Sequence, residues 1–212
     1  CLYMPAPDVW QSIADTNGGD DPVSITVRGT DDSGSSKGTS AAISARFSAV
    51  RVDGGLYYWT TDGGRILRVD FGAATQPQQF YPFQDNGTCY GCHALAKNGK
   101  HMSLSRSGQY DGRLTIIEIA TQSILLQDVD DKREQFQTWD PTSMMFAGVW
   151  SDDQTPDTNI RIRDGRTGDV LEAIDVAVEP DHPDWSPRGD RILFTVVTRH
   201  QTSQRPGRGG IS

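Results

Sequence analysis

Residues 185–194 read WSPRGDRILF. In this stretch a large aromatic residue, Trp185, precedes a tight polar turn that contains Gly189, and an apolar strand pattern begins at Ile192. Glycine suits such a turn because it adopts positive φ angles without a steric penalty. The stretch therefore predicts the end of one strand, a tight turn and the beginning of the next antiparallel strand.

The same arrangement occurs three more times along the chain. Its large apolar anchors are Phe47, Leu95, Trp139 and Trp185, which subtraction places 48, 44 and 46 residues apart. Residues 65–81, 114–127 and 160–174 add a strand, a turn rich in Gly and Asp, and a second strand to the first three copies. Four strands in each period of about 46 residues are the signature of β-propeller blades. We therefore predict an all-β propeller fold.

The repeats stop before a ring is complete. The fourth copy ends near Thr198, and residues 205–210 (RPGRGG) are typical of a loop. We expect an incomplete ring in this chain, closed by further sequence or by another chain. Residues 1–46 predict a short N-terminal segment with one helical turn near Trp10 and a small β unit. The predicted domains are therefore 1–46 and 47–212.

Residues 89–93 read CYGCH, which is the attachment signature of c-type haem. Thiols three residues apart would lie about one helical turn apart, so Cys89 and Cys92 can bond to both vinyl groups along one porphyrin edge. His93 would then give its imidazole to the iron as the proximal ligand. Tyr90, inside the motif, is expected to lie against the porphyrin. The sequence predicts one covalently attached haem c.

Three other interpretations of the motif are weaker. A structural zinc site needs four ligands, and no second pair of Cys or His follows. A thioredoxin-like Cys-x-x-Cys belongs to a βαβ unit, whereas strand patterns follow here. A disulfide between Cys89 and Cys92 would leave His93 unexplained.

A family resemblance supports both the repeat and the haem motif. Residues 183–195 (PDWSPRGDRILFT) resemble the repeat of TolB-like β-propellers, with Arg188 in place of the usual acidic turn residue. Residues 89–100 (CYGCHALAKNGK) are similar to the haem-bearing version of that repeat in bacterial extracytoplasmic proteins, although Ala96 and Asn98 replace its Ser and Asp. The resemblance covers about residues 47–198. It implies a periplasmic, outer-membrane-associated or extracellular protein.

The distal side of the iron would decide the chemistry. An iron with two protein ligands transfers electrons, whereas an open position binds or activates a small ligand. Aligning Gly99 with Gly189 places Cys92 on His182. His182 therefore returns to the same rim of the propeller two blades later, and it is the favoured candidate for the distal ligand. The alternative is a rim histidine held by the local turn.

Two further side chains are weaker distal candidates. Met102 falls on the position of Ile192 in the fourth repeat, so it is expected to fill the core. His101 falls on Arg191 and is expected to point away from Met102 and to be exposed. The charged stretch that ends at Glu134 is expected to form a solvated loop between blades.

Composition limits the choice of partners. The chain has 212 residues and a net charge of -8, which argues against nucleic acid or an anionic membrane surface as a partner. No apolar run approaches the ~20 residues of a membrane-spanning helix. Cys1 is left over once the haem motif is assigned. It resembles the lipid-carrying residue of a bacterial lipoprotein, and the alternative is that the chain simply begins there.

Three function hypotheses follow. The first is an extracytoplasmic electron carrier, not an enzyme, with redox proteins as partners and a homo-oligomer or larger assembly as a further option. The second is a peroxidase- or reductase-like haem enzyme with an open distal position and a polar distal residue such as His101 or Arg106. The third is a binding or scaffold propeller in which the haem is structural.

Overall fold

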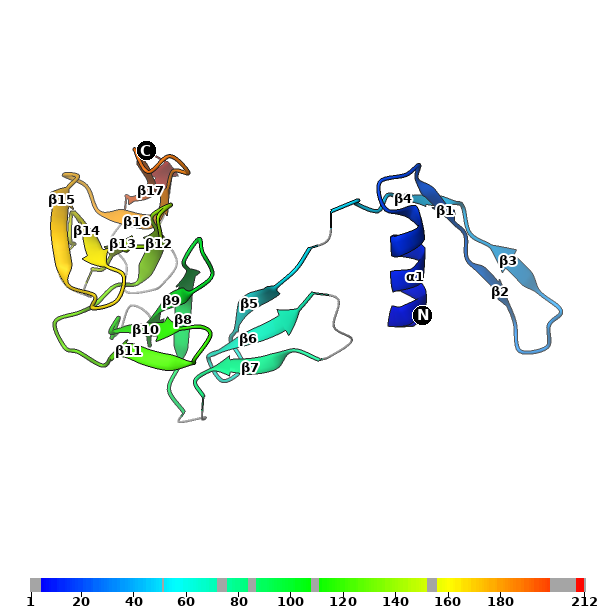
Figure 1. The fold of residues 1–212 in the computed structure, drawn as a ribbon, viewed down its shortest axis with the longest axis horizontal. Coiled ribbons are helices and arrows are strands. Elements are labelled where there is room, and N and C mark those ends of the chain that lie inside the picture. Colours follow the sequence, from blue (N-terminus) through cyan, green and yellow to red (C-terminus); the bar gives the residue numbers. More distant parts are fainter. Residues whose placement is uncertain are drawn as a thin grey trace. The chain divides into compact units, whose positions relative to one another are not determined.

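The computed structural model describes residues 5–50, 52–71, 76–83, 87–107, 111–151, 156–198 and 209–211. One helix and many short strands make up the regular structure of these residues (Figure 1). The prediction of an all-β fold is confirmed. Among the same residues, no helix combines the length and the apolar character that crossing a membrane requires.

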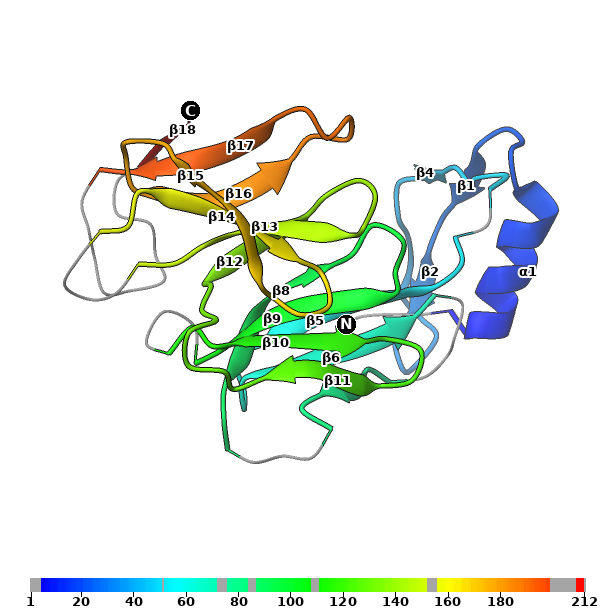
Figure 2. The same cartoon turned by 60° about the vertical axis from the view of Figure 1, so that its left-hand side comes forward.

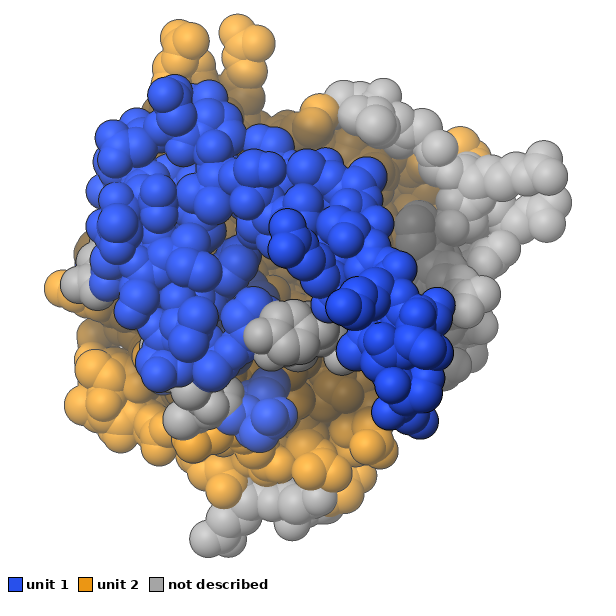
Figure 3. All heavy atoms as spheres, turned by 90° about the vertical axis from the view of Figure 1, so that its right-hand side faces the viewer, with its two compact units in different colours: residues 1–56, 69–77 blue, residues 57–68, 78–212 orange. Residues whose placement is uncertain are grey.

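The chain divides into two compact units, which Figure 3 shows in different colours. The smaller unit comprises Cys1–Leu56 and Val69–Pro77, and the larger unit comprises Tyr57–Arg68 and Gln78–Ser212. The predicted boundary between residues 46 and 47 stays a prediction. The larger unit contains the CYGCH stretch.

The smaller unit contains the helix α1 (Pro7–Asn17), which is longer than the single turn predicted near Trp10. Proline at its beginning and Asp8 in its first turn both favour a helix N-terminus. The β unit is a hairpin in two parts, in which β1 (Val23–Ile25) pairs with β4 (Ile43–Ala45), and β2 (Arg28–Thr30) pairs with β3 (Lys37–Thr39). The Ser40 hydroxyl accepts a hydrogen bond from the Val27 N–H at the break between the two parts.

Four successive antiparallel sheets follow in the order of the sequence (Figures 1 and 2). The first has three strands: β5 (Gly55–Thr60), β6 (Arg65–Asp70) and β7 (Gln78–Tyr81). The second has four: β8 (Tyr90–Leu95), β9 (His101–Arg106), β10 (Leu114–Glu118) and β11 (Ser123–Gln127). The third has four: β12 (Phe136–Trp139), β13 (Met145–Val149), β14 (Asn159–Asp164) and β15 (Val170–Asp175). The fourth has three: β16 (Pro180–Trp185), β17 (Ile192–Val197) and β18 (Gly209–Ile211).

Apolar side chains fill the space between successive sheets. Ile66 and Phe80 of the first sheet pack with Met102 and Leu104 of the second. The remaining sheets join in the same way through the buried clusters Ala96, Leu114, Ile116, Leu126, Trp139 and Phe146, and then Ala147, Val149, Ile160 and Ile162 with Trp185 and Phe194 packed against them. Each sheet therefore covers the apolar face of the next, as blades of a propeller do.

The predicted tight turns occupy equivalent places in the second, third and fourth sheets. Gly99, Ser143 and Gly189 all have positive φ angles, of 70°, 62° and 77°. Ser143 is not glycine, and the Asp140 carboxylate stabilises its turn by accepting hydrogen bonds from the backbone of three residues, Thr142, Met144 and Met145. The Asn98 N–H donates to the Ser143 hydroxyl at 3.0 Å, so neighbouring turns are linked.

Candidate functional site

The CYGCH stretch lies on the first strand of the second sheet. Cys89 precedes β8, and Tyr90 to His93 belong to that strand. The Tyr90 N–H donates to the Gly64 carbonyl at 2.8 Å, and the Ser107 N–H donates to the Cys89 carbonyl at 2.7 Å. The expected helical turn between the two cysteines is therefore wrong, because Tyr90 to His93 belong to an edge strand that pairs with β9.

A β-bulge replaces the helical turn. The pairing of β8 with β9 shifts register between Gly91 and Ala94, and Cys92 within this interval has a φ of 48°. The pairing of β16 with β17 shifts between Asp181 and Asp184 in the same way, and His182 has a φ of 43°. A bulge re-aims side chains and is common next to functional sites. The alignment of Cys92 with His182 thus holds in the backbone conformation.

Neither cysteine of the motif forms a disulfide, and neither is fully buried. Cys89 is exposed and Cys92 is partly exposed. A Cβ atom on Gly64 would lie 2.6 Å from the Cys89 Sγ atom. Any residue other than glycine at position 64 would therefore clash with Cys89. Burial raises the pKa of the Cys89 thiol. Burial raises the pKa of Cys92 to about 12, and the nearby Cys89 and Asp181 groups add to the shift.

His93 is partly buried beside the first sheet. Its Nε2 atom lies 3.4 Å from the Tyr57 carbonyl oxygen, which is long for a hydrogen bond. Burial lowers the pKa of His93, an effect that the Tyr57 carbonyl opposes. The imidazole is therefore neutral at neutral pH, and neutral imidazole is the form that binds a metal.

Tyr90 packs into the core rather than toward the surface. It is 1% exposed, its ring meets the Tyr81 ring edge-on at 4.8 Å, and its hydroxyl accepts a hydrogen bond from the Gln127 amide at 3.2 Å. Its predicted contact with a porphyrin stays a prediction.

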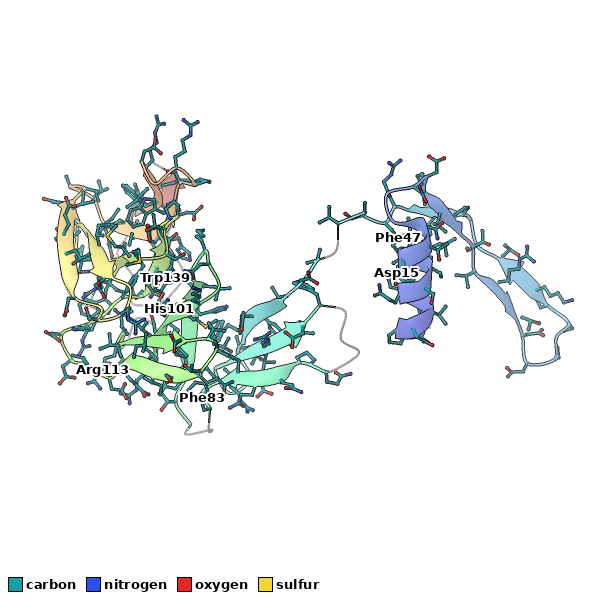
Figure 4. The ribbon with its side chains drawn as sticks, in the orientation of Figure 1. Asp15, Phe47, Phe83, His101, Arg113 and Trp139 are labelled. Atoms are coloured by element: carbon teal, nitrogen blue, oxygen red, sulfur yellow. The ribbon has the colours of Figure 1, made fainter. Side chains whose placement is uncertain are left out.

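Met102 and His101 lie at the turn end of β9, away from Cys92. Met102 is fully buried in the core between the first and second sheets, as its alignment with a core position predicted. The expectation that His101 is exposed is wrong. Trp139 of the next sheet stacks on the His101 ring with the centroids 6.1 Å apart, and both ring nitrogens are buried. Figure 4 labels the two residues. Burial and the Arg166 charge lower the pKa of His101.

His182 is the distal candidate with the most defined surroundings. Its side chain is 45% exposed, and its Nδ1 atom lies 3.1 Å from the Asp181 carboxylate. Its ring stacks on Phe136 with the centroids 3.8 Å apart. The structure thus places His182 on the bulge of β16 and Met102 in the core.

Sequence reasoning missed two neighbours of the site, Phe136 and Trp59. Phe136 lies 46 residues before His182, so the repeat alignment places it at the same position in the third sheet. The repeat period of about 46 residues was the one sequence signal that could have identified Phe136. Trp59 covers the motif from the first sheet, because a Cβ atom on Gly91 would lie 3.1 Å from the indole nitrogen. No sequence signal links Trp59 to Gly91, because the two residues are far apart in the chain.

The expectation that Glu134 belongs to a solvated loop is also wrong. It is 0% exposed and pairs with Arg163 at 2.6 Å and with Arg161 at 3.5 Å. Burial raises the pKa of Glu134, although both arginines oppose the shift. A Cβ atom on Gly148 would lie 2.6 Å from Glu134, so glycine makes room for the buried carboxylate. Glu134 links the start of β12 to β14.

Within the described residues, no group of three or more His, Cys, Asp or Glu side chains lies together as a metal site. An iron held by a porphyrin needs no such group, because the ring supplies four ligands and the protein adds one or two.

Comparison with known proteins supports the fold. No protein-family model matches the chain, and no curated protein matches it. Kuenenia stuttgartiensis hydrazine synthase is similar in structure, with 12% identity and a TM-score of 0.50 over 81% of this chain and 49% of the other. A chain of a nidogen/laminin complex has 10% identity and a TM-score of 0.51 over 74% and 60%. Both neighbours show the fold alone, and the present chain spans about half of the first and 60% of the second. This chain has a β-propeller fold.

Proposed function

We propose that this β-propeller carries one haem c, attached covalently at Cys89 and Cys92, and that it transfers single electrons. His93 is the proximal ligand of the iron in this proposal. The observation that carries it is that two cysteines outside any disulfide and a neutral imidazole lie within five residues of one another, at the start of one bulged strand. Bound haem would supply the one-electron chemistry of its iron, which no amino-acid side chain here provides.

The donor set of the motif, two thiols and one imidazole, fits the two thioether bonds and the iron bond of haem c. Gly64 and Gly91 lack the side chains that would otherwise crowd the Cys89 sulfur and the Trp59 ring. Both cysteines keep their protons, and a thiol is the group that adds to a vinyl double bond to form a thioether. The single long contact of His93 with Tyr57 leaves its imidazole weakly held. In this proposal β8 and the residue before it supply two sulfur atoms and one nitrogen to the haem.

Location and partners belong to the same proposal. The resemblance of residues 89–100 to haem-bearing extracytoplasmic repeats favours a periplasmic, outer-membrane-associated or extracellular protein. Redox proteins would be the partners of an electron carrier, and a homo-oligomer or larger assembly would bring haems together. The lipid-anchor hypothesis for Cys1 concerns a residue outside those that the structure describes.

Covalent haem is the direct test. The chain would be produced in a bacterium that has haem-attachment machinery, extracted with acidified acetone and assayed as the pyridine haemochrome. We expect one haem per chain, lost when Cys89 and Cys92 are both replaced by serine and kept in the matched control Cys1→Ser. A folded chain without haem under these conditions would contradict the proposal.

A further inference from the structure

The hairpin of β5 and β6 lies along the haem motif and contacts it at both ends. At one end, a Cβ atom on Gly64 would lie 2.6 Å from the Cys89 Sγ atom. At the other end, the Tyr57 carbonyl oxygen lies 3.4 Å from the His93 Nε2 atom. The hairpin therefore spans the motif from its first residue to its last.

Trp59 is the residue of this hairpin that meets the middle of the motif. A Cβ atom on Gly91 would lie 3.1 Å from the Trp59 Nε1 atom and 3.2 Å from its Cε2 atom. The edge of the indole ring therefore fills the space that a side chain at position 91 would take. Gly91 is buried, whereas Trp59 is 39% exposed. Trp59 thus lies against the backbone between the two cysteines and keeps part of its surface open.

The proposed attachment limits where a porphyrin can lie. Thioether bonds from Cys89 and Cys92 would hold one edge of the porphyrin along the backbone that joins these two residues. Gly91 belongs to that backbone, and it has no side chain to keep a bound group away. Trp59 reaches the same backbone from the first sheet. The attached porphyrin edge and the indole ring would therefore be neighbours.

We propose that Trp59 is a contact residue of the haem, and that its indole ring packs on the porphyrin edge held by Cys89 and Cys92. This inference rests on the proposed function, because it requires the haem. Aromatic rings pack on flat apolar groups by dispersion and by excluding water. The apolar surroundings of a metal site control its access to water and hence its redox potential. Trp59 therefore raises the midpoint potential by sheltering the haem from water.

Neighbouring aromatic side chains of the first sheet pack differently. The Tyr57 ring meets the Phe80 ring edge-on with the centroids 4.8 Å apart. Phe83 is 39% exposed, as Trp59 is, but its ring meets the Tyr81 ring edge-on at 5.2 Å. These rings pack on one another at the core between the first and second sheets. Trp59 differs from them because its ring lies against the backbone of the motif itself.

The test measures the midpoint potential and the Soret circular dichroism of the haem-loaded chain in wild type, Trp59→Leu and Trp59→Phe. We expect Trp59→Leu to keep its covalent haem, to have a more negative potential and to change the Soret signal, because water reaches the haem edge. Trp59→Phe keeps a smaller ring, so it should shift less in the same direction, and it carries the comparison if Trp59→Leu does not fold. The matched control Trp10→Leu removes a ring that is 41% exposed in the smaller unit and should equal the wild type.

The outcomes separate this inference from the proposed function. A wild-type chain without covalent haem overturns both. Covalent haem with an unchanged potential and Soret signal in the folded Trp59 variants, or with an equal shift in Trp10→Leu, overturns only the role of Trp59. Urea unfolding distinguishes a purely structural role, because Trp59→Leu should cost more stability with haem than in the haem-free Cys89→Ser/Cys92→Ser chain. Equal losses in the two backgrounds would also overturn the contact with haem.

Discussion

The first strands of two adjacent sheets, β8 and β12, occupy the same place in the repeat but differ in how they pair. β12 pairs with β13 in unbroken register from Phe136 to Trp139. β8 pairs with β9 through a bulge at Cys92. The regular strand carries an aromatic side chain that packs, and the bulged strand carries the side chains of the proposed site. The bulge, which β16 shares, is therefore the backbone feature that distinguishes the strand of the proposed site from β12.

The largest expected loss of stability comes from replacing Glu134, the buried carboxylate that precedes β12. Glu134→Ala would leave Arg163 buried without its closest partner. Removing one member of a buried ion pair costs about 3–5 kcal/mol, so we expect unfolding at much lower urea concentration. The control Asp130→Ala removes a carboxylate that is 83% exposed and should change stability by less than about 1 kcal/mol. Equal effects of the two variants would show that Glu134 does not anchor β12.

Glycine substitutions at the equivalent positions test the comparison directly. Phe136→Gly removes a packed ring from the regular strand and is expected to cost about 2–4 kcal/mol. His182→Gly relieves a positive φ angle on β16, which has the same bulge as β8, and we expect a change within about 1 kcal/mol. Chemical denaturation of both variants without haem measures the difference. A larger loss for His182→Gly would mean that the bulge is structural.

Two glycines differ in how much space their surroundings leave for a side chain: Gly148 in the third sheet and Gly91 on the edge strand of the second. A Cβ atom at Gly148 would lie 2.6 Å from buried Glu134, whereas one at Gly91 would lie 3.1 Å from Trp59, a partly exposed ring that can shift. We expect Gly148→Ala to destabilise by about 1–3 kcal/mol, as overpacking does, and Gly91→Ala by less. Thermal unfolding compares them, and the reverse order would contradict the packing described here.

The smallest effect concerns acid stability at the contact between the second and third sheets. The lowered pKa of His101 means that the unfolded chain binds a proton more readily than the folded one. His101 therefore favours folding above the ordinary histidine pKa of about 6.5, and this contribution is lost as the pH falls below that value. Stability measured between pH 7 and 5 should decline less steeply in His101→Gln than in the wild type. Parallel declines would show that His101 does not contribute.

The repeat and its turns could be predicted because they depend on local chemistry. An apolar anchor, a residue that tolerates positive φ and an apolar strand recur within short stretches around Gly99, Ser143 and Gly189. The cofactor motif is equally local, since Cys89, Cys92 and His93 are adjacent in the chain. The helical spacing expected for these residues is wrong because β8 pairs with β9, which lies outside the motif, and forms a bulge at Cys92.

Exposure and pairing between sheets could not be predicted in this way. The sequence predicts that Glu134 is part of a charged loop and that His101 is a surface residue. The burial of Glu134 follows from Arg163, and the partial burial of His101 follows from Trp139; these partners lie 29 and 38 residues further along the chain by subtraction. The repeat period, the turns and the Cys-x-x-Cys-His chemistry are properties of short segments, so they can be read from the amino-acid order. The bulges at Cys92 and His182, and the surroundings of each imidazole, depend on packing between distant strands, which forms only when the chain folds.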